Sequence, residues 1–313
     1  MSYSNRIFMY GPVALLLLIV ILYSVFWRVE ADTLAARLDR ANGGELVPGV
    51  SFSFAQKTVG GFPFRLDALL SGVSFEYRSG GTQLDWRSDR VALHRLVYGR
   101  GQFIFEADGM QSFTWTDRQD AKPATVSLMP ETARASAILT NGRLVRLDLD
   151  IWRPRGTEQY AQQPKIDFSA DRAQFHALAR RNNTLDLVLQ VDNGRADAAV
   201  APAALQMSFP LIDCRATFDR AGSLIGVENG TEDIAGALQQ WRAQQGSIDV
   251  TSLSVNWPDA RATLRGKLTI DADDHLSGIL RGDQVGEKGS THEIQLAFDH
   301  GTAKFGVPAE AKR

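Results

Sequence analysis

The sequence contains a single cysteine, Cys214, among its 313 residues. A disulfide within the chain is therefore excluded, and in an oxidising compartment the thiol would stay free or bridge to a second chain. We favour the interpretation that Cys214 is a small core residue, because free cysteines are among the most buried residue types.

An excess of charge of one sign is also missing. The chain has 34 Lys and Arg residues against 36 Asp and Glu residues, which gives a formal net charge of −2. A nucleic-acid-binding protein would normally show a basic excess or a basic stripe. The balance therefore argues against a nucleic-acid partner.

Catalytic and cofactor-binding motifs are absent as well. The five histidines form no HExxH pattern, and there is no G-x-S-x-G elbow, no Walker loop and no dinucleotide fingerprint. We expect no catalytic residue, no cofactor and no metal site, and we expect that the protein is not an enzyme. A hydrolase with an unrecognised site would instead show ionisable side chains that converge in a pocket.

Two polar clusters resemble metal sites at first sight. His292-Glu293 and His300 flank a predicted strand, and Asp271-Ala272-Asp273-Asp274 resembles the start of a calcium loop. That loop needs a glutamate at its twelfth position, which is Gly282 here. We interpret the first cluster as solvated strand ends and the second as a polar hairpin turn.

What the sequence does contain is one long apolar run. Ile7 to Trp27 carries no charge and lies between Arg6 and Arg28. A helix rises about 1.5 Å per residue, so this run can cross a hydrocarbon core about 30 Å thick. Amphipathic rings such as that of Trp27 favour the membrane interface. The run predicts a transmembrane anchor whose flanks are Arg6, Trp27 and Arg28.

The anchor has two alternative fates. The apolar core of a cleaved signal peptide is about 7–15 residues long, which is shorter than this run, although Val29-Glu30-Ala31 resembles a weak cleavage site. We predict an uncleaved signal anchor. Residues 1–6 would stay in the cytoplasm and the body would be exported, because long downstream domains translocate largely regardless of their own charge.

The hydrophobic period changes after the anchor. Residues 28–45 predict a short helical stalk that Gly43-Gly44 would end. Residues 46–305 show a period of two, most clearly in the alternation of Leu147-Asp148-Leu149-Asp150-Ile151. Strict alternation predicts strands with one apolar and one polar face. Residues 306–313 predict a disordered tail.

Short turns join the predicted strands. Asp108-Gly109, Asn141-Gly142 and Asn193-Gly194 tolerate the positive φ angles of tight hairpins. Many strands with short turns favour an antiparallel sheet over alternating β-α units. We predict a mainly β protein, in which the transmembrane helix is followed by a large curled antiparallel β-sheet. The sheet is either continuous or divided into two lobes near residues 155–180.

One or two short helices accompany the predicted sheet. Thr231 to Gln245 begins with a good cap, and Ile234, Leu238 and Trp241 form an apolar stripe at helical spacing. We expect this helix to cover one end or one face of the sheet. Asp171 to Arg181 fits a helix or a strand equally well.

The most distinctive local stretch is Val59-Gly60-Gly61-Phe62-Pro63-Phe64-Arg65. Paired glycines permit unusual backbone angles, and proline fixes φ and removes a hydrogen-bond donor. In the structural interpretation, a bend lodges both phenylalanine rings in a core. In the functional interpretation, Phe62 and Phe64 form an aromatic lip for an apolar ligand, and Arg65 holds an anionic headgroup.

Several of these features occur together in a known family. The anchor, the helix after it, the stretch Gly60 to Arg65, and a helix ending in Trp241 followed by a strand ending in Trp257 are similar to the DUF 2125 family. That family is common in alphaproteobacteria and has no assigned function. Residues 240–280 also resemble AsmA-type envelope proteins, which implies an anchored, curled sheet with a role in lipid transfer or envelope assembly.

These observations lead to two functional hypotheses. In the first, the protein sits in the bacterial inner membrane with its body in the periplasm, and an apolar concave face holds a lipid or another apolar ligand. The motivation is that strands with one apolar face far outnumber the helices available to cover them. In the alternative, the sheet is an envelope scaffold with a filled core that binds other envelope proteins along its exposed edges.

Overall fold

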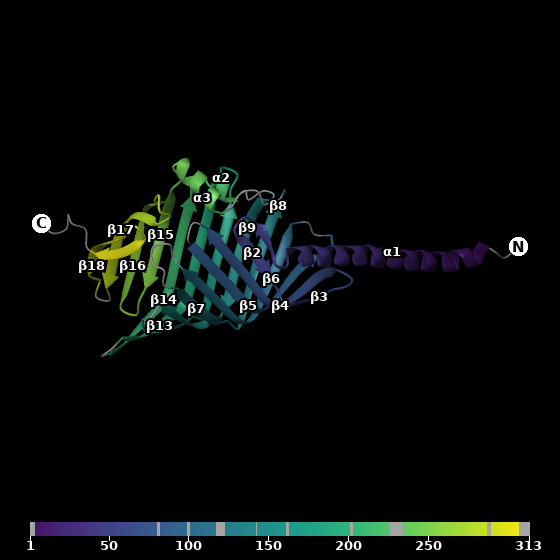
Figure 1. Cartoon of the computed structure of the whole chain (residues 1–313), viewed down its shortest axis with the longest axis horizontal. Coiled ribbons are helices and arrows are strands. Elements are labelled where there is room, and N and C mark those ends of the chain that lie inside the picture. The colour runs from purple at the N-terminus through teal and green to yellow at the C-terminus, as the bar shows by residue number, and fades with distance from the viewer. Residues whose placement is uncertain are drawn as a thin grey trace.

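The computed structural model describes residues 4–79, 82–98, 101–116, 123–141, 143–160, 163–200, 203–225, 234–286 and 289–306. A long N-terminal helix projects from a body made of one large antiparallel sheet (Figure 1). The sheet is curled, and two short helices lie beside one end of its strands (Figure 1). The predicted mainly β fold with a long apolar helix at its N-terminus is confirmed.

The N-terminal helix α1 (Ser4–Ala41) is continuous, so the predicted span and the predicted stalk are parts of one helix. Gly43 follows it with a φ of 77°, the left-handed conformation in which glycine commonly ends helices. The chain then enters strand β1 (Gly44–Val47) at once. The helix therefore ends at Gly43-Gly44, as the sequence predicts, and the first strand begins at Gly44.

Nineteen strands of the described chain form the sheet. After β1 they are β2 (Val50–Ser53), β3 (Gln56–Gly60), β4 (Arg65–Ser79), β5 (Thr82–Leu96), β6 (Gln102–Thr116), β7 (Ala124–Met129), β8 (Thr132–Thr140), β9 (Arg143–Trp152), β10 (Arg155–Tyr160), β11 (Ile166–Ser169), β12 (Arg172–Ala179), β13 (Leu185–Val200), β14 (Ala203–Phe218), β15 (Ile248–Asn256), β16 (Ala260–Ile270), β17 (Leu276–Gly286), β18 (Thr291–Asp299) and β19 (Thr302–Gly306). Gly306 thus belongs to a strand rather than to the predicted tail, and residues 307–313 lie outside the described chain.

Several short strands share one long partner. β2 and β3 both pair with β4, β7 and β8 both pair with β6, and β11 and β12 both pair with β13. Pro130 separates β7 from β8, and Pro154 lies between β9 and β10. Proline has no N–H to donate to a ladder, so each one interrupts a long strand. Strands β10, β11 and β12 each pair with a strand on both sides, and the described residues form one sheet.

Two of the predicted hairpin turns are instead irregularities inside long strands. Gly109 lies within β6 with a φ of 82°, where the carboxylate of Asp89 accepts a hydrogen bond of 2.8 Å from the backbone N–H of Met110. Asn193 lies within β13 with a φ of 50°. Sequence propensity alone does not separate a bulge from a turn, because both use positive φ. Asn141 does close the β8–β9 hairpin, as predicted.

The register places one apolar row across the whole sheet. Cross-strand partners lie on the same face, and each residue of this row is paired with the next. From β3 to β18 the row is Val59, Ala68, Leu93, Phe105, Ala135, Leu149, Phe175, Leu189, Cys214, Leu253, Leu264, Gly282 and Ile294. The neighbouring row on the opposite face is polar over most of its length and includes Glu106, Arg134, Asp150, Gln174, Gln190 and Asp213.

A helix covers each end of the apolar face. At the N-terminal end, Ala31 and Leu34 of α1 are buried against Leu66 and Ala68 of β4, both 0% exposed. Phe54, Leu70, Val73 and Val91 form a second cluster beside it. These contacts tie α1 to the body through its last turns.

At the C-terminal end, helix α3 (Ile234–Ala243) places Trp241, which is 0% exposed, on strands β15 to β18. Its indole N–H donates a 2.7 Å hydrogen bond to the carbonyl of Asp219. Gly246 passes the ring so closely that a Cβ there would lie 2.2 Å from it. The predicted helix is found over its central part, while its predicted cap, Thr231, lies outside the described residues.

Two further local predictions can be compared with the structure. The stretch 171–181, which fitted a helix or a strand, forms strand β12 between β9 and β13. A short helix, α2 (Gly222–Ile225), precedes α3 and was not predicted. Cys214 is partly buried on β14 at the margin of the C-terminal core, and burial raises the pKa of its thiol.

Candidate functional site: an uncovered apolar face beside an aromatic lip

No helix is described as packing on the large apolar side chains in the middle of the apolar face; α2 reaches only the start of β9, where Arg143 donates a hydrogen bond to the carbonyl of Gly222. Strands β6, β9, β12 and β13 present nine large apolar side chains there, and none of the nine belongs to a buried cluster of the described chain. Most are half-buried, and Leu189 is 43% exposed. We name this set the central apolar face: Phe103, Phe105, Leu147, Leu149, Ile151, Phe175, Leu187, Leu189 and Val191.

The central apolar face can do little chemistry. Apart from Cys214, the apolar row that crosses it contains no ionisable side chain. An apolar surface of this kind favours removal from water at about 25 cal/mol per Å². What the arrangement can do is hold an apolar group.

The second feature is the turn between β3 and β4, which contains the predicted ligand residues. Phe62 and Phe64 are 52% and 64% exposed, so the interpretation in which a bend lodges both rings in a core is wrong. Gly61 takes a φ of 98°, and the Phe62–Pro63 peptide is cis. The turn projects the aromatic side chains of Phe62 and Phe64 instead of burying them. We name Phe62, Pro63, Phe64 and Arg65 the lip.

The lip is fixed to the end of the predicted span. The Tyr23 hydroxyl donates a 2.5 Å hydrogen bond to the carbonyl of Pro63, and the Trp27 indole donates one of 2.9 Å to the carbonyl of Arg65. The Trp27 and Phe62 rings meet edge-on with centroids 5.4 Å apart. Local sequence patterns do not predict these contacts, because they join residues about 40 positions apart. An aromatic pair at the end of a span and a second one in a Gly-Pro turn were the available signals.

The lip lies at the same ends of the strands as the first residues of the central apolar face. The Val97 N–H, just after β5, donates a 3.3 Å hydrogen bond to the carbonyl of Phe64. The next strand, β6, begins at Gln102 beside the end of β5, and the ring of Phe103 is stacked on that of Phe105 at 6.4 Å. The chain thus connects the end of the span, the lip and the first aromatic residues of the central apolar face.

The three arginines singled out in the sequence, Arg6, Arg28 and Arg65, lie in different surroundings. Arg65 pairs with Asp67 at 3.1 Å and its side chain stays 60% exposed. Arg28 pairs with Asp32 at 3.2 Å on the outside of α1. The side chain of Arg6 lies outside the described part. Arg65 and Arg28 are thus both exposed, and each is paired with a carboxylate.

A hollow of about 400 Å³ lies on the polar face around Asp148, His176 and Arg146. Burial raises the pKa of Asp148, but hydrogen bonds from His176 and Arg146, each 2.7 Å long, outweigh it and lower the pKa overall. Because the cations here are already matched by carboxylates, we interpret the cluster as a stabilising ion-pair network of the polar face.

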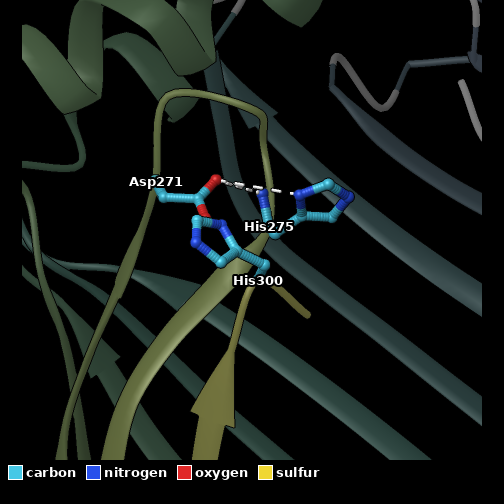
Figure 2. Close-up of side chains that lie close together, drawn as sticks. All are labelled: Asp271, His275 and His300. Atoms are coloured by element: carbon cyan, nitrogen blue, oxygen red, sulfur yellow. Dashed lines mark hydrogen bonds and ion pairs between the residues drawn. The ribbon is translucent and has the colours of Figure 1, made fainter. Parts of the chain in front are cut away.

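A third cluster joins two turns at the C-terminal end. Figure 2 shows Asp271, His275 and His300, whose potential ligand atoms lie within 4.8 Å of one another. The imidazole of His300 is 2.9 Å from the Asp271 carboxylate, which also accepts hydrogen bonds from the backbone N–H groups of Asp273 and His275. These bonds lower the pKa of Asp271. The sequence interpretation of His300 as a solvated strand end missed this contact between the β16–β17 and β18–β19 turns.

Two imidazoles and one carboxylate are ligands that a transition metal such as Zn²⁺ accepts. Here the carboxylate already serves three donors, and Arg242 pairs with Asp274 of the same turn at 3.0 Å. The nearby guanidinium opposes a bound cation. We therefore interpret the cluster as a hydrogen-bonded lock between two turns.

A known protein family matches most of the chain. Residues 27–281 match the family described as "Uncharacterized protein conserved in bacteria (DUF2125)". The chain belongs to this family. The matched region begins at the end of the predicted span and takes in the lip, the central apolar face and helix α3. No curated protein and no solved structure matches the chain, so the AsmA resemblance stays a prediction.

Proposed function

We propose that this DUF2125 protein is a single-pass protein of the bacterial inner membrane whose periplasmic sheet binds the acyl chain of a lipid on its central apolar face. The observation that carries the proposal is the contrast along one continuous apolar row. Helices bury both ends of the row, while the large side chains in the middle have no such cover in the described chain. Surfaces of this kind normally mark a binding site.

The energetics suit a flexible apolar ligand. Burying a methylene group contributes about 0.8 kcal/mol, so ten methylenes would contribute roughly 8 kcal/mol before the cost of ordering the chain. No hydrogen bond or catalytic group is required for this. Binding without chemistry also agrees with the absence of ionisable side chains, other than Cys214, from the row.

The anchor supports a function at the membrane. The helix has an apolar window from Pro12 onward with a mean hydropathy of 2.2, long enough to cross a bilayer. A cleaved signal peptide would be separated from the mature chain, but here Tyr23 and Trp27 are hydrogen-bonded to the lip and Leu34 is part of a core. These contacts favour an anchor that stays attached.

The test is site-specific photo-crosslinking in the full chain, in native membranes. A benzophenone amino acid replaces Phe175 on the central apolar face in one variant and Gln174, the adjacent residue on the polar face, in the other. We expect lipid to be attached after irradiation at position 175 and not at position 174, as read by mass spectrometry. Protein adducts at both positions, without lipid, would overturn the proposal in favour of the envelope scaffold.

A further inference from the structure

We propose that the lip and the adjacent Tyr98 are inserted in the interfacial layer of the bilayer that α1 spans, which places the start of the central apolar face at the membrane surface. This membrane seat goes beyond lipid binding, because it states where the body touches the membrane. It rests on the proposed function for the anchor, but not for the ligand.

The depth of the lip follows from its contacts with α1. Tyr23 and Trp27 are four residues apart, which is about 6 Å along a helix axis. Tyr23 bonds to Pro63 and Trp27 bonds to Arg65, so the lip runs along the last turn of the uncharged segment. If the hydrocarbon core ends near Trp27, the lip cannot lie far outside it, because two hydrogen bonds and the Trp27–Phe62 ring contact hold it there.

The side chains of the lip suit that depth. Phe64 is 64% exposed and Tyr98, directly after the Val97 that bonds to the lip, is 69% exposed. Leu96, at the end of β5, is 39% exposed. Exposing these three side chains to water is unfavourable, whereas aromatic rings are favoured at the level of the lipid headgroups. Trp27 and Tyr23 would belong to the same aromatic belt.

Two arginines lie where they can contact lipid headgroups in the proposed membrane seat. Arg65 follows Phe64 directly, and its guanidinium is exposed enough to reach a phosphate while it pairs with Asp67. Arg28 lies one residue beyond Trp27 on α1. Basic side chains at this level attract anionic headgroups. The predicted role of Arg65 in holding a headgroup would then apply to the bilayer surface as much as to a bound lipid.

The consequence is an entry route for the ligand. The lip, Val97 and Phe103 lie at neighbouring strand ends. Phe103 is the first residue of the central apolar face. With these strand ends in the headgroup layer, an acyl chain could move from the leaflet onto the sheet without crossing water. The β-sheet would then contact the membrane surface directly instead of being connected to it by α1 alone.

The experiment is a spin-label accessibility measurement on the full chain in vesicles of phosphatidylethanolamine and phosphatidylglycerol. Cys214 is changed to alanine, and a single cysteine label is placed at Phe64, at Tyr98 or at the control position Leu69. Leu69 is 53% exposed and lies on β4, about 13 Å of strand from Arg65. All three positions are exposed, so labelling should leave the fold intact, which circular dichroism would verify.

We expect labels at positions 64 and 98 to be relaxed more by oxygen, which partitions into lipid, than by a water-soluble nickel chelate. The label at position 69 should show the reverse. Nickel accessibility at 64 and 98 equal to that at 69 would overturn the membrane seat. A seated lip without lipid adducts at Phe175 would leave the seat standing and refute the lipid-binding function, so the two proposals fail separately.

Discussion

The two ends of the apolar face and its middle are built from the same kind of strand but have different surroundings. At the ends, a helix adds side chains such as Leu34 and Trp241, and residues of the sheet become almost fully buried. In the middle, equally apolar residues such as Phe175 and Leu189 stay half-exposed or exposed. The alternation of the strands is therefore not what decides burial. For the large side chains, a covering helix separates the two regions, whereas the small residues Ala137 and Ala177 are buried on β8 and β12 as well.

The largest effect is expected where a helix fills the core. Trp241→Ala should lower the free energy of unfolding by about 3–5 kcal/mol, because a fully buried indole and its hydrogen bond to Asp219 are lost. The measurement is urea unfolding of the detergent-solubilised full chain, followed by circular dichroism. Trp152→Ala is the control, since Trp152 is 45% exposed on the polar face, and should cost under about 1 kcal/mol. Equal losses would show that α3 does not form the core we describe.

The comparison sharpens with one substitution made in both regions. Leu280→Ala at the covered end, where Leu280 is 2% exposed, should cost about 2–5 kcal/mol. Leu189→Ala in the middle should cost under about 1 kcal/mol in lipid-free detergent, because that side chain is already 43% exposed. The same unfolding experiment gives both numbers. A loss at Leu189 as large as at Leu280 would mean that the middle is covered in solution.

A charge on the middle of the face should act on binding more than on stability. Leu189→Lys places an ammonium group where the acyl chain is proposed to lie, and we expect at least about tenfold less lipid adduct at position 175, since burying an unpaired charge is costly. Gln190→Lys, one residue along on the polar face, is the matched control and should leave the adduct unchanged. Equal adduct yields from the two variants would contradict the assigned binding face.

The smallest effect is expected on the polar face. Hydrogen bonds from Arg172, 2.7 and 2.8 Å long, lower the pKa of Asp150 below its usual range. A lowered folded-state pKa stabilises the protein above the unfolded pKa of about 3.9, and that stability is lost as the pH falls through the folded pKa. Asp150→Asn should therefore reduce the urea midpoint slightly at pH 7, and by less as the pH falls below the unfolded pKa. A difference that grows on acidification would show that the pairing with Arg172 is not what stabilises Asp150.

Local periodicity was enough to predict much of this fold. The alternation around Leu147-Asp148-Leu149 follows from strand geometry, and the apolar stripe of Ile234, Leu238 and Trp241 marked the covering helix. The errors came where two structures use the same local conformation. Gly109 and Asn193 have the positive φ of a turn, yet the strands continue through them, because the pairing with neighbouring strands continues on both sides.

The candidate site was only partly accessible to sequence reasoning. Phe62, Phe64 and Arg65 stood out by composition, but the contacts of the lip with Trp27 of α1 join residues far apart in the chain. The contact of His300 with Asp271 likewise depends on two hairpins meeting, 29 positions apart in the chain. Long-range contacts of this kind leave no periodic signal. Which part of the sheet stays uncovered depends on where α1 and α3 pack, and local sequence patterns do not encode this.

The most direct test of the account places the benzophenone probe at three positions of the full chain in native membranes. Phe175 lies on the central apolar face, Gln174 on the polar face, and Val250 in the covered C-terminal core, where it is 4% exposed. The account predicts lipid adducts at 175 and none at 174 or 250. Lipid at none of the three positions, or equally at 174 and 175, would contradict the claim that the uncovered middle of the apolar face is where this protein holds its ligand.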